Sequence, residues 1–86
     1  MNNMRETVHE LKIENQFLMD LLDKRKKVEI RKNDRSYHIC DLLRFNNPIP
    51  NVYPYSYFFI ITHIQEGYGL KKGYVALSVE RYEPAL

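Results

Sequence analysis

Hydrophobic positions recur with two different periods along this chain, and those periods predict where its helix and strands lie. In residues 8–13 apolar and polar side chains alternate, which is typical of a strand with one face toward a core. In residues 14–23 apolar side chains recur four positions apart, with Phe17 above Leu21, so this segment is predicted to be an amphipathic helix. Alternation returns in residues 27–31, which we interpret as a second strand.

The second half of the chain contains three more strand-like segments separated by turn-rich connections. Residues 46–54 hold three prolines and three asparagines, and residues 66–73 hold all three glycines, so both are predicted to be loops. Strands are expected at residues 39–45, 55–65 and 74–82, and the long apolar run of the middle one favours burial on both faces. One helix cannot cover both faces of an open sheet of about five strands. The order therefore predicts an α+β fold, a curled, partly closed β-barrel with the early helix packed at its end.

The length and the cysteine content limit the class of protein further. The chain has 86 residues, enough for one domain, which we place at residues 8–83 after a flexible segment at residues 1–7. Cys40 is the only cysteine, so an intramolecular disulfide is excluded. We find no signal peptide and no apolar run long enough to span a bilayer. We therefore expect a cytoplasmic monomer that does not associate with a membrane.

The net charge of +2 indicates little, but the charges are distributed unevenly along the chain. Seven lysines and arginines fall within residues 24–35, where only Glu29 and Asp34 oppose them. A basic stretch on a nearly neutral protein is typical of a phosphate-binding surface. Solvated turns also carry short basic runs, so the charge alone leaves both interpretations open.

Glu29 and Arg31 form the centre of this stretch, because they lie two positions apart on one strand face. Val28 and Ile30 are predicted to face the core, which turns Glu29 and Arg31 together toward solvent or a cleft. Such a pair is either an exposed ion pair that adds little stability or an arginine oriented by its glutamate to hold a phosphate or a base edge.

Several segments carry a resemblance to a known family, and the Glu-Ile-Arg-Lys-Asn-Asp-Arg run within residues 26–35 is the most specific of them. The other segments are residues 9–13, Phe17, residues 41–43 and residues 69–78. Together they resemble the ASCH (activating signal cointegrator homology) superfamily of PUA-like β-barrels, especially its small bacterial and phage members. The resemblance implies a cleft beside the helix, with RNA or a nucleotide as its ligand.

Two positions depart from the family pattern. Lys24 stands where the family usually has the glycine of a Gly-x-Lys motif, with Lys26 at the lysine position. Cys40 stands where the family favours a glycine before Asp41. If the backbone at Lys24 is left-handed, a residue other than glycine costs about 1 kcal/mol there.

The basic stretch and the resemblance together select a set of candidate ligand-binding residues. The set comprises His9, Lys12, Lys26, Glu29, Arg31, Lys32, Asn33, Arg35 and Tyr74. Its lysines and arginines are expected to hold phosphates, while Glu29 and Asn33 contact or orient the base. Tyr74 follows a glycine and faces away from the core face of its strand, so it is the best candidate for stacking on a base. His9 is either a buried structural histidine or a cleft residue.

The leading interpretation is thus an RNA- or nucleotide-binding module, and a small RNA-directed hydrolase is the first alternative. Some ASCH enzymes are similar to amidohydrolases that remove an acyl group from a modified cytidine with a lysine, a threonine and a glutamate. Lys26 matches the lysine, but Glu29 stands at the threonine position, so we expect no such deacylation. A ribonuclease would use His9 with Lys26 or Glu29 as acid and base.

The second alternative is a phage or bacterial factor that meets a protein partner through the basic face, in competition with nucleic acid. Salt-sensitive RNA binding separates the binding module from this factor, and turnover of labelled RNA identifies a hydrolase. No cofactor and no metal are expected, because the H-x-C spacing of His38 and Cys40 supplies only two ligands.

Overall fold

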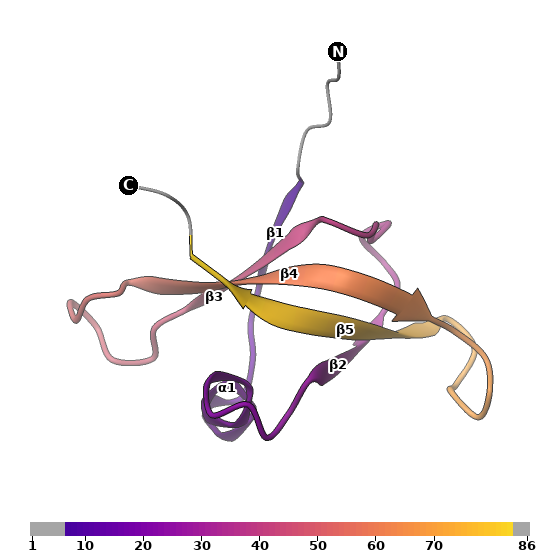
Figure 1. Ribbon diagram of the computed structural model, residues 1–86, viewed down its shortest axis with the longest axis horizontal. Coiled ribbons are helices and arrows are strands. Elements are labelled where there is room, and N and C mark those ends of the chain that lie inside the picture. Colours follow the sequence, from indigo (N-terminus) through magenta and orange to yellow (C-terminus); the bar gives the residue numbers. More distant parts are fainter. Residues whose placement is uncertain (1–6, 84–86) are drawn as a thin grey trace, which may run out of the picture.

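The computed structural model describes residues 7–83, and these form one curled sheet of five strands with a single helix (Figure 1). The elements are β1 (Val8–Leu11), α1 (Asn15–Leu22), β2 (Val28–Lys32), β3 (Leu42–Asn46), β4 (Ser56–Gln65) and β5 (Tyr74–Tyr82). The predicted α+β fold, a curled sheet with one early helix, is confirmed. The predicted flexible N-terminal segment lies outside the described residues apart from Thr7, whose carbonyl accepts a hydrogen bond from the Leu42 amide at 2.9 Å.

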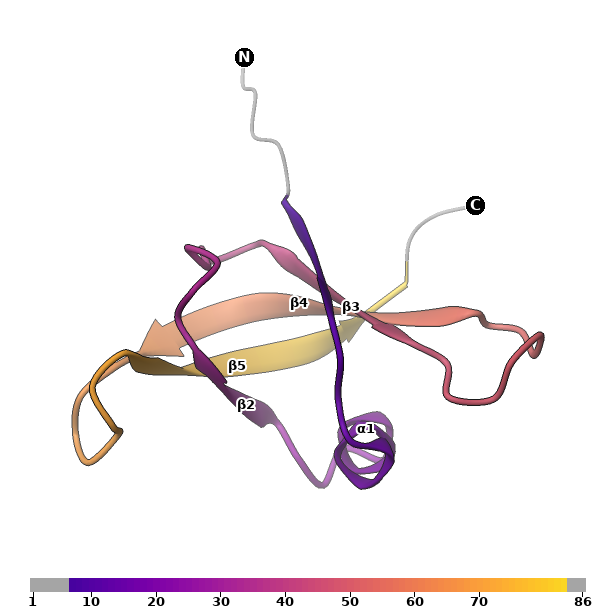
Figure 2. The same cartoon turned by 180° about the vertical axis from the view of Figure 1, so that it is seen from behind.

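The strand order is β1-β3-β4-β5-β2, so the first two strands of the chain lie at opposite edges of the sheet. β1 runs parallel to β3, and the other neighbouring strands are antiparallel. The segment that joins β1 to β2 therefore has to cross from one edge to the other. It does so with α1, which lies below β4 and β5 in both views (Figures 1 and 2).

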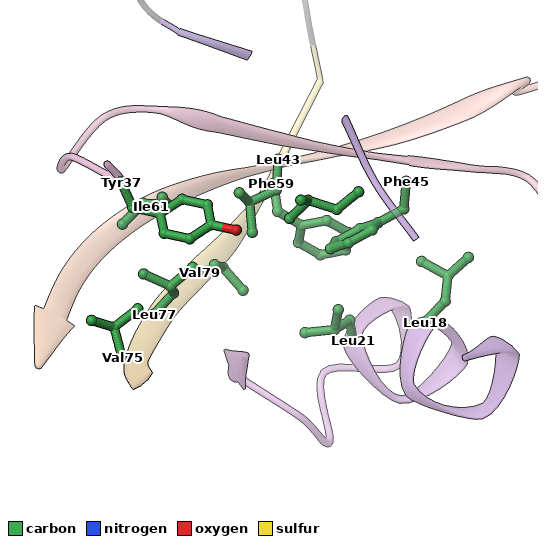
Figure 3. Packing of buried hydrophobic residues seen from close by; sticks show 11 residues of the cluster. Leu18, Leu21, Tyr37, Leu43, Phe45, Phe59, Ile61, Val75, Leu77 and Val79 are labelled. Carbon is green, nitrogen blue, oxygen red and sulfur yellow. The ribbon is translucent and has the colours of Figure 1, made fainter. Parts of the chain in front are cut away.

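The core lies between α1 and the face of the sheet that turns toward it (Figure 3). Alternate residues of β3, β4 and β5 supply most of it, as the period of two in a strand requires. These residues are Leu43, Phe45, Phe59, Ile61, Val75, Leu77 and Val79, and Leu18 and Leu21 meet them from α1. The ring of Tyr37 extends into the same cluster from the connection between β2 and β3. A register shift between Ile61 and His63 interrupts the β4–β5 ladder, and such irregularities increase the local twist of a sheet.

β2 presents the opposite face to the core from the one that its pattern predicts. Val28 and Ile30 are 39% and 55% exposed, whereas Glu29 is only 4% exposed. β2 is an edge strand, and apolar side chains from β5 and α1 already fill the core beside it. The carboxylate can be buried because Lys26 and Arg31 pair with it.

β4 and α1 also differ from the expected burial. The apolar run of β4 is buried on one face only, through Phe59 and Ile61, because no second layer of the described residues covers the outer face of the sheet. In α1, Leu18 and Leu21 enter the core, whereas Phe17 is 43% exposed. Phe17 thereby becomes part of a surface rather than part of the core.

Five described residues other than glycine have a positive φ, and two of them, Lys24 and Cys40, stand at the positions that depart from the family pattern. Lys24 has a φ of 64° and Cys40 a φ of 78°, and both stand at positions where the ASCH pattern has glycine. Lys24 therefore has a left-handed backbone, the case in which a residue other than glycine costs about 1 kcal/mol. The turn at Cys40 also explains why β3 begins only at Leu42, three residues later than the alternation predicts.

Candidate functional site

Glu29 is the centre of the candidate site, and its side chain is only 5% exposed. The Lys26 Nζ lies 3.2 Å from Glu29 Oε1, and the Arg31 Nη1 donates to Glu29 Oε2 at 2.9 Å. Each carboxylate oxygen is thus held by one cation, which compensates the cost of burying the charge. The side chains of Lys26 and Arg31 are 24% and 22% exposed, so both cations keep one side open to solvent.

The end of α1 positions Lys26. The amide of Lys24 donates to the Leu21 carbonyl at 3.2 Å, and the amide of Arg25 donates to the Asp20 carbonyl at 2.9 Å. This pair of bonds around a left-handed residue is a Schellman motif, the usual way to end a helix at glycine. It turns the chain toward β2 within two residues. The Lys26 amide also donates to the Asp20 carbonyl, at 3.0 Å.

The Lys26 ammonium makes two further contacts that fix its place. The Nζ donates to the Val28 carbonyl at 2.7 Å. It also lies 5.1 Å from the centre of the Phe17 ring, within the range of a cation–π interaction. The exposed ring of α1 and the buried carboxylate of β2 are therefore joined through one lysine.

An open cavity of about 630 Å³ lies beside these groups, and we call it the Glu29 cavity. Its walls are Lys12, Ile13, Glu14, Phe17, Lys26, Glu29, Ile30 and Arg31. The volume is in the range of small-molecule sites. Three apolar side chains, three cations and two carboxylates share the wall, so the cavity can hold a group that is flat on its faces and polar at its edges.

The other candidate residues lie in two neighbouring hollows, with one exception. Arg31, Lys32 and Arg35 line a hollow of about 320 Å³ together with Ile30, Asp34 and Tyr37; we call it the Arg35 hollow. Asn33 and Tyr74 line a third hollow of about 480 Å³, where the Lys71 Nζ lies 5.9 Å from the centre of the Tyr74 ring. Only His9 lines none of the three hollows.

His9 is buried and belongs to a structural contact between β1 and the start of β3. Its Nε2 lies 2.8 Å from Asp41 Oδ2, and its ring packs at 4.7 Å against Tyr37. The same carboxylate oxygen accepts the backbone N–H of His38 at 2.9 Å. His9 therefore pairs with Asp41 and does not line the cavity of Lys26 and Glu29, the two residues considered as its partners in a ribonuclease.

Tyr37 is a site residue that the sequence analysis did not select. It is 7% exposed, and it lines the Arg35 hollow while its ring packs in the core. Burial raises the pKa of the Tyr37 phenol above its ordinary value of 10.0, and the positive charge of Arg31 acts in the opposite direction. No local pattern marks Tyr37, because the turn at residues 33–36 decides where it points.

The described residues contain neither a group of metal ligands nor a helix that could span a membrane. Within residues 7–83 no three histidine, cysteine, aspartate or glutamate side chains are grouped closely enough to hold a metal ion. The same part of the chain contains no helix with the length and apolar character needed to cross a membrane.

A comparison with protein families identifies the family of this chain. No curated protein matches the chain. A family model described as a domain of unknown function, DUF3850, matches residues 8–79. The matched segment includes the whole candidate site, from His9 to Tyr74. Because the model covers well over half of the 86 residues, the chain belongs to the DUF3850 family.

Proposed function

We propose that this protein binds RNA or a nucleotide and holds a base in the Glu29 cavity. The observation that carries the proposal is the buried Glu29 carboxylate, clamped by Lys26 and Arg31 at the wall of an open cavity. A buried ion pair is weak evidence for stability, since apolar residues of similar volume often stabilise a fold equally well. A carboxylate with two fixed cations is, however, well suited to reading the polar edge of a ligand.

The walls of the cavity support a ligand that is both planar and anionic. Phe17 lines the cavity and is 43% exposed, although a ring of this size is usually buried in a core. Aromatic side chains stack on unpaired bases with little dependence on sequence. Lys12, which is exposed, and the open side of Arg31 add positive charge at the rim for backbone phosphates.

The same features favour a PUA-like relationship for this fold. Lys24 and Cys40, which stand where the ASCH pattern favours glycine, both have a left-handed backbone, which glycine adopts readily. Lys26, Glu29 and Arg31 of the most specific block converge on one cavity. We therefore propose that this DUF3850 domain is an ASCH-type, PUA-like domain.

Binding is favoured over hydrolysis by the composition of the cavity wall. None of the described residues that line the Glu29 cavity carries a hydroxyl or a thiol group. An amidohydrolase of the kind considered above needs such a nucleophile beside its lysine. Glu29, which stands in its place, is already engaged by two cations.

The proposal is tested by fluorescence anisotropy with a labelled single-stranded RNA of about twelve nucleotides. If the cavity and its rim neutralise about three phosphates, the logarithm of the affinity falls with the logarithm of the salt concentration with a slope of about −2. The RNA should remain intact throughout the titration. Absence of binding at low salt would reject the proposal, and cleavage of the RNA would favour the hydrolase.

A further inference from the structure

Arg31 separates two hollows of different chemical character. The Glu29 cavity, on one side, has apolar wall residues in Ile13 and Phe17 and carries both signs of charge. The Arg35 hollow, on the other side, has about half the volume and is lined mainly by charged groups. Because Arg31 lines both, a ligand that fills one hollow lies directly beside the other.

The charge of the Arg35 hollow matches a phosphate group. Three cations, Arg31, Lys32 and Arg35, line it against the single carboxylate of Asp34. The Arg35 Nε lies 4.0 Å from Asp34 Oδ1, and its side chain is 47% exposed, so this pairing is loose and leaves the guanidinium accessible. Lys32 makes no ion pair with any residue in the range 7–83. The lining residues thus carry more positive than negative charge even though Arg31 also pairs with Glu29, and this excess favours an anion such as a phosphate group.

The guanidinium of Arg31 is already oriented for a second partner. Its Nη1 donates to Glu29 Oε2 at 2.9 Å and to the Lys12 carbonyl at 3.1 Å. A guanidinium is a rigid fork with five N–H donors, so anchoring one nitrogen fixes the directions of the others. Donors that are fixed before binding lose less conformational entropy when a phosphate arrives.

From this geometry we propose that the Arg35 hollow binds the phosphate of the nucleotide whose base occupies the Glu29 cavity. The inference rests on the function proposed above and narrows its ligand class to phosphorylated nucleotides rather than free nucleosides. The phosphate can be a terminal monoester, with three terminal oxygens, or a diester of an RNA chain, with two non-bridging oxygens and a single charge. Either can accept hydrogen bonds from Arg31, Lys32 and Arg35.

The test compares each of the four ribonucleosides with its 5′- and 3′-monophosphates in NMR titrations of the labelled protein. The wild-type protein should bind the preferred monophosphate at least about tenfold more tightly than its nucleoside. The double variant Lys32→Ala/Arg35→Ala should lose this advantage and keep the nucleoside affinity. The matched control is Arg25→Ala/Lys27→Ala, which removes the same charge from two exposed positions that line none of the three hollows. It should keep the advantage.

A dinucleoside monophosphate identifies the source of the phosphate. Equal affinity for this diester and for the monophosphate indicates an RNA backbone, and a preference for the monophosphate indicates a terminal phosphate. Equal affinity for nucleoside and monophosphate in the wild-type protein, or equal losses in the two double variants, overturns the inference. Continued binding of the labelled RNA in that case would leave the proposed function standing. Absence of binding to RNA, nucleosides and monophosphates alike would reject both.

The two alanine substitutions fall on exposed side chains, and circular dichroism checks that the variants are folded. A second double variant, Lys32→Gln/Arg35→Gln, keeps polar side chains longer than that of alanine and removes their charge. It should lose the monophosphate advantage to the same extent. Retention of the advantage in this variant would also overturn the inference.

Discussion

Arg31 donates a hydrogen bond from Nη1 to the Lys12 carbonyl at 3.1 Å, and this bond joins the two edges of the sheet. Lys12 directly follows β1, and Arg31 lies in β2, at the other end of the strand order. The same nitrogen holds the Glu29 carboxylate. The Arg31 side chain therefore connects the two edge strands of the curled sheet and also holds the carboxylate at the centre of the candidate site. We expect the stability of the fold and the affinity for ligand to be coupled through this residue.

Replacing Arg31 by lysine separates its geometry from its charge. An ammonium on a flexible stem cannot reproduce the fixed fork that reaches both Lys12 and Glu29. We expect Arg31→Lys to lower the free energy of unfolding by about 1–2 kcal/mol in urea denaturation. RNA affinity should fall by about 1–3 kcal/mol although the net charge is unchanged. Arg25→Lys, the same change at a side chain that is 78% exposed, should alter neither quantity measurably. Equal effects of the two changes would contradict the special role of Arg31.

His9 and Asp41 are predicted to act on stability rather than on binding. Asp41 is 6% exposed and accepts hydrogen bonds from the His9 ring and the His38 amide. Asp41→Ala leaves both donors without this partner and should lower the free energy of unfolding by about 2–3 kcal/mol. RNA affinity of the folded variant should stay within a factor of about two. A His9→Gln variant of unchanged stability that no longer binds RNA would contradict this assignment.

Glycine substitutions at Lys24 and Cys40 test whether their positive φ angles cost stability. Lys24→Gly and Cys40→Gly should each raise the free energy of unfolding by about 0.5–1 kcal/mol, because glycine adopts a positive φ without a steric penalty. The gain is reduced by the greater freedom of glycine in the unfolded chain. Arg25→Gly, next to Lys24 and without a positive φ, should be destabilising in the same assay. If Lys24→Gly destabilises the protein as much as Arg25→Gly, the Schellman motif does not set the end of α1.

The fold is largely predictable from the sequence because periodicity and turn residues mark each element. β5 lies at the residues that alternation predicts, and β4 begins one residue later. The face of β2 that packs against the core is not predictable in this way, because the alternation of apolar residues predicts that Val28 and Ile30 are buried. The actual orientation depends on Lys26, which reaches Glu29 only after the helix end has turned the chain.

The residues of the candidate site also differ in how far the sequence predicts their positions. Residues 26–35 are contiguous, so their closeness in the sequence is enough to group them around neighbouring hollows, although alternation predicts the wrong face of β2. His9 and Tyr37 depend on contacts between distant segments: β1 pairs in parallel with β3, and the turn before β3 places Tyr37 against the His9 ring. The roles of these two residues therefore could not be read from spacing along the chain.

Tyr37 makes the stability of the protein depend on pH in the alkaline range. Its pKa is raised by burial, so the protonated phenol stabilises the fold fully below the unfolded value of 10.0. This contribution is lost as the pH rises through the folded-state pKa. The free energy of unfolding of the wild-type protein should therefore fall above about pH 10 more steeply than that of Tyr37→Phe. Tyr68→Phe, at a side chain that is 94% exposed, should behave like the wild type. Parallel curves for wild type and Tyr37→Phe would contradict the burial of the phenol.

Glu29→Gln tests the role of the central carboxylate through the sign of its effect. The change removes a negative charge, so a carboxylate that only repels RNA predicts tighter binding in the variant. A carboxylate that orients Lys26 and Arg31 predicts the reverse, because both cations lose the partner that fixes them. We expect RNA affinity to fall by about 1–2 kcal/mol despite the added positive charge.

The matched control for Glu29→Gln is Glu83→Gln, which changes the net charge equally at a side chain that is 78% exposed. It should tighten RNA binding slightly, and more at low salt than at high salt. Because Glu29→Gln also leaves two partly buried cations without their counter-charge, its free energy of unfolding should fall by about 2 kcal/mol. The RNA titrations should therefore be carried out at a temperature where circular dichroism shows that the Glu29→Gln variant is folded. If both substitutions tighten binding to the same extent, Glu29 neither orients the cations nor contacts the ligand. That result would reject the Glu29 cavity as the binding site.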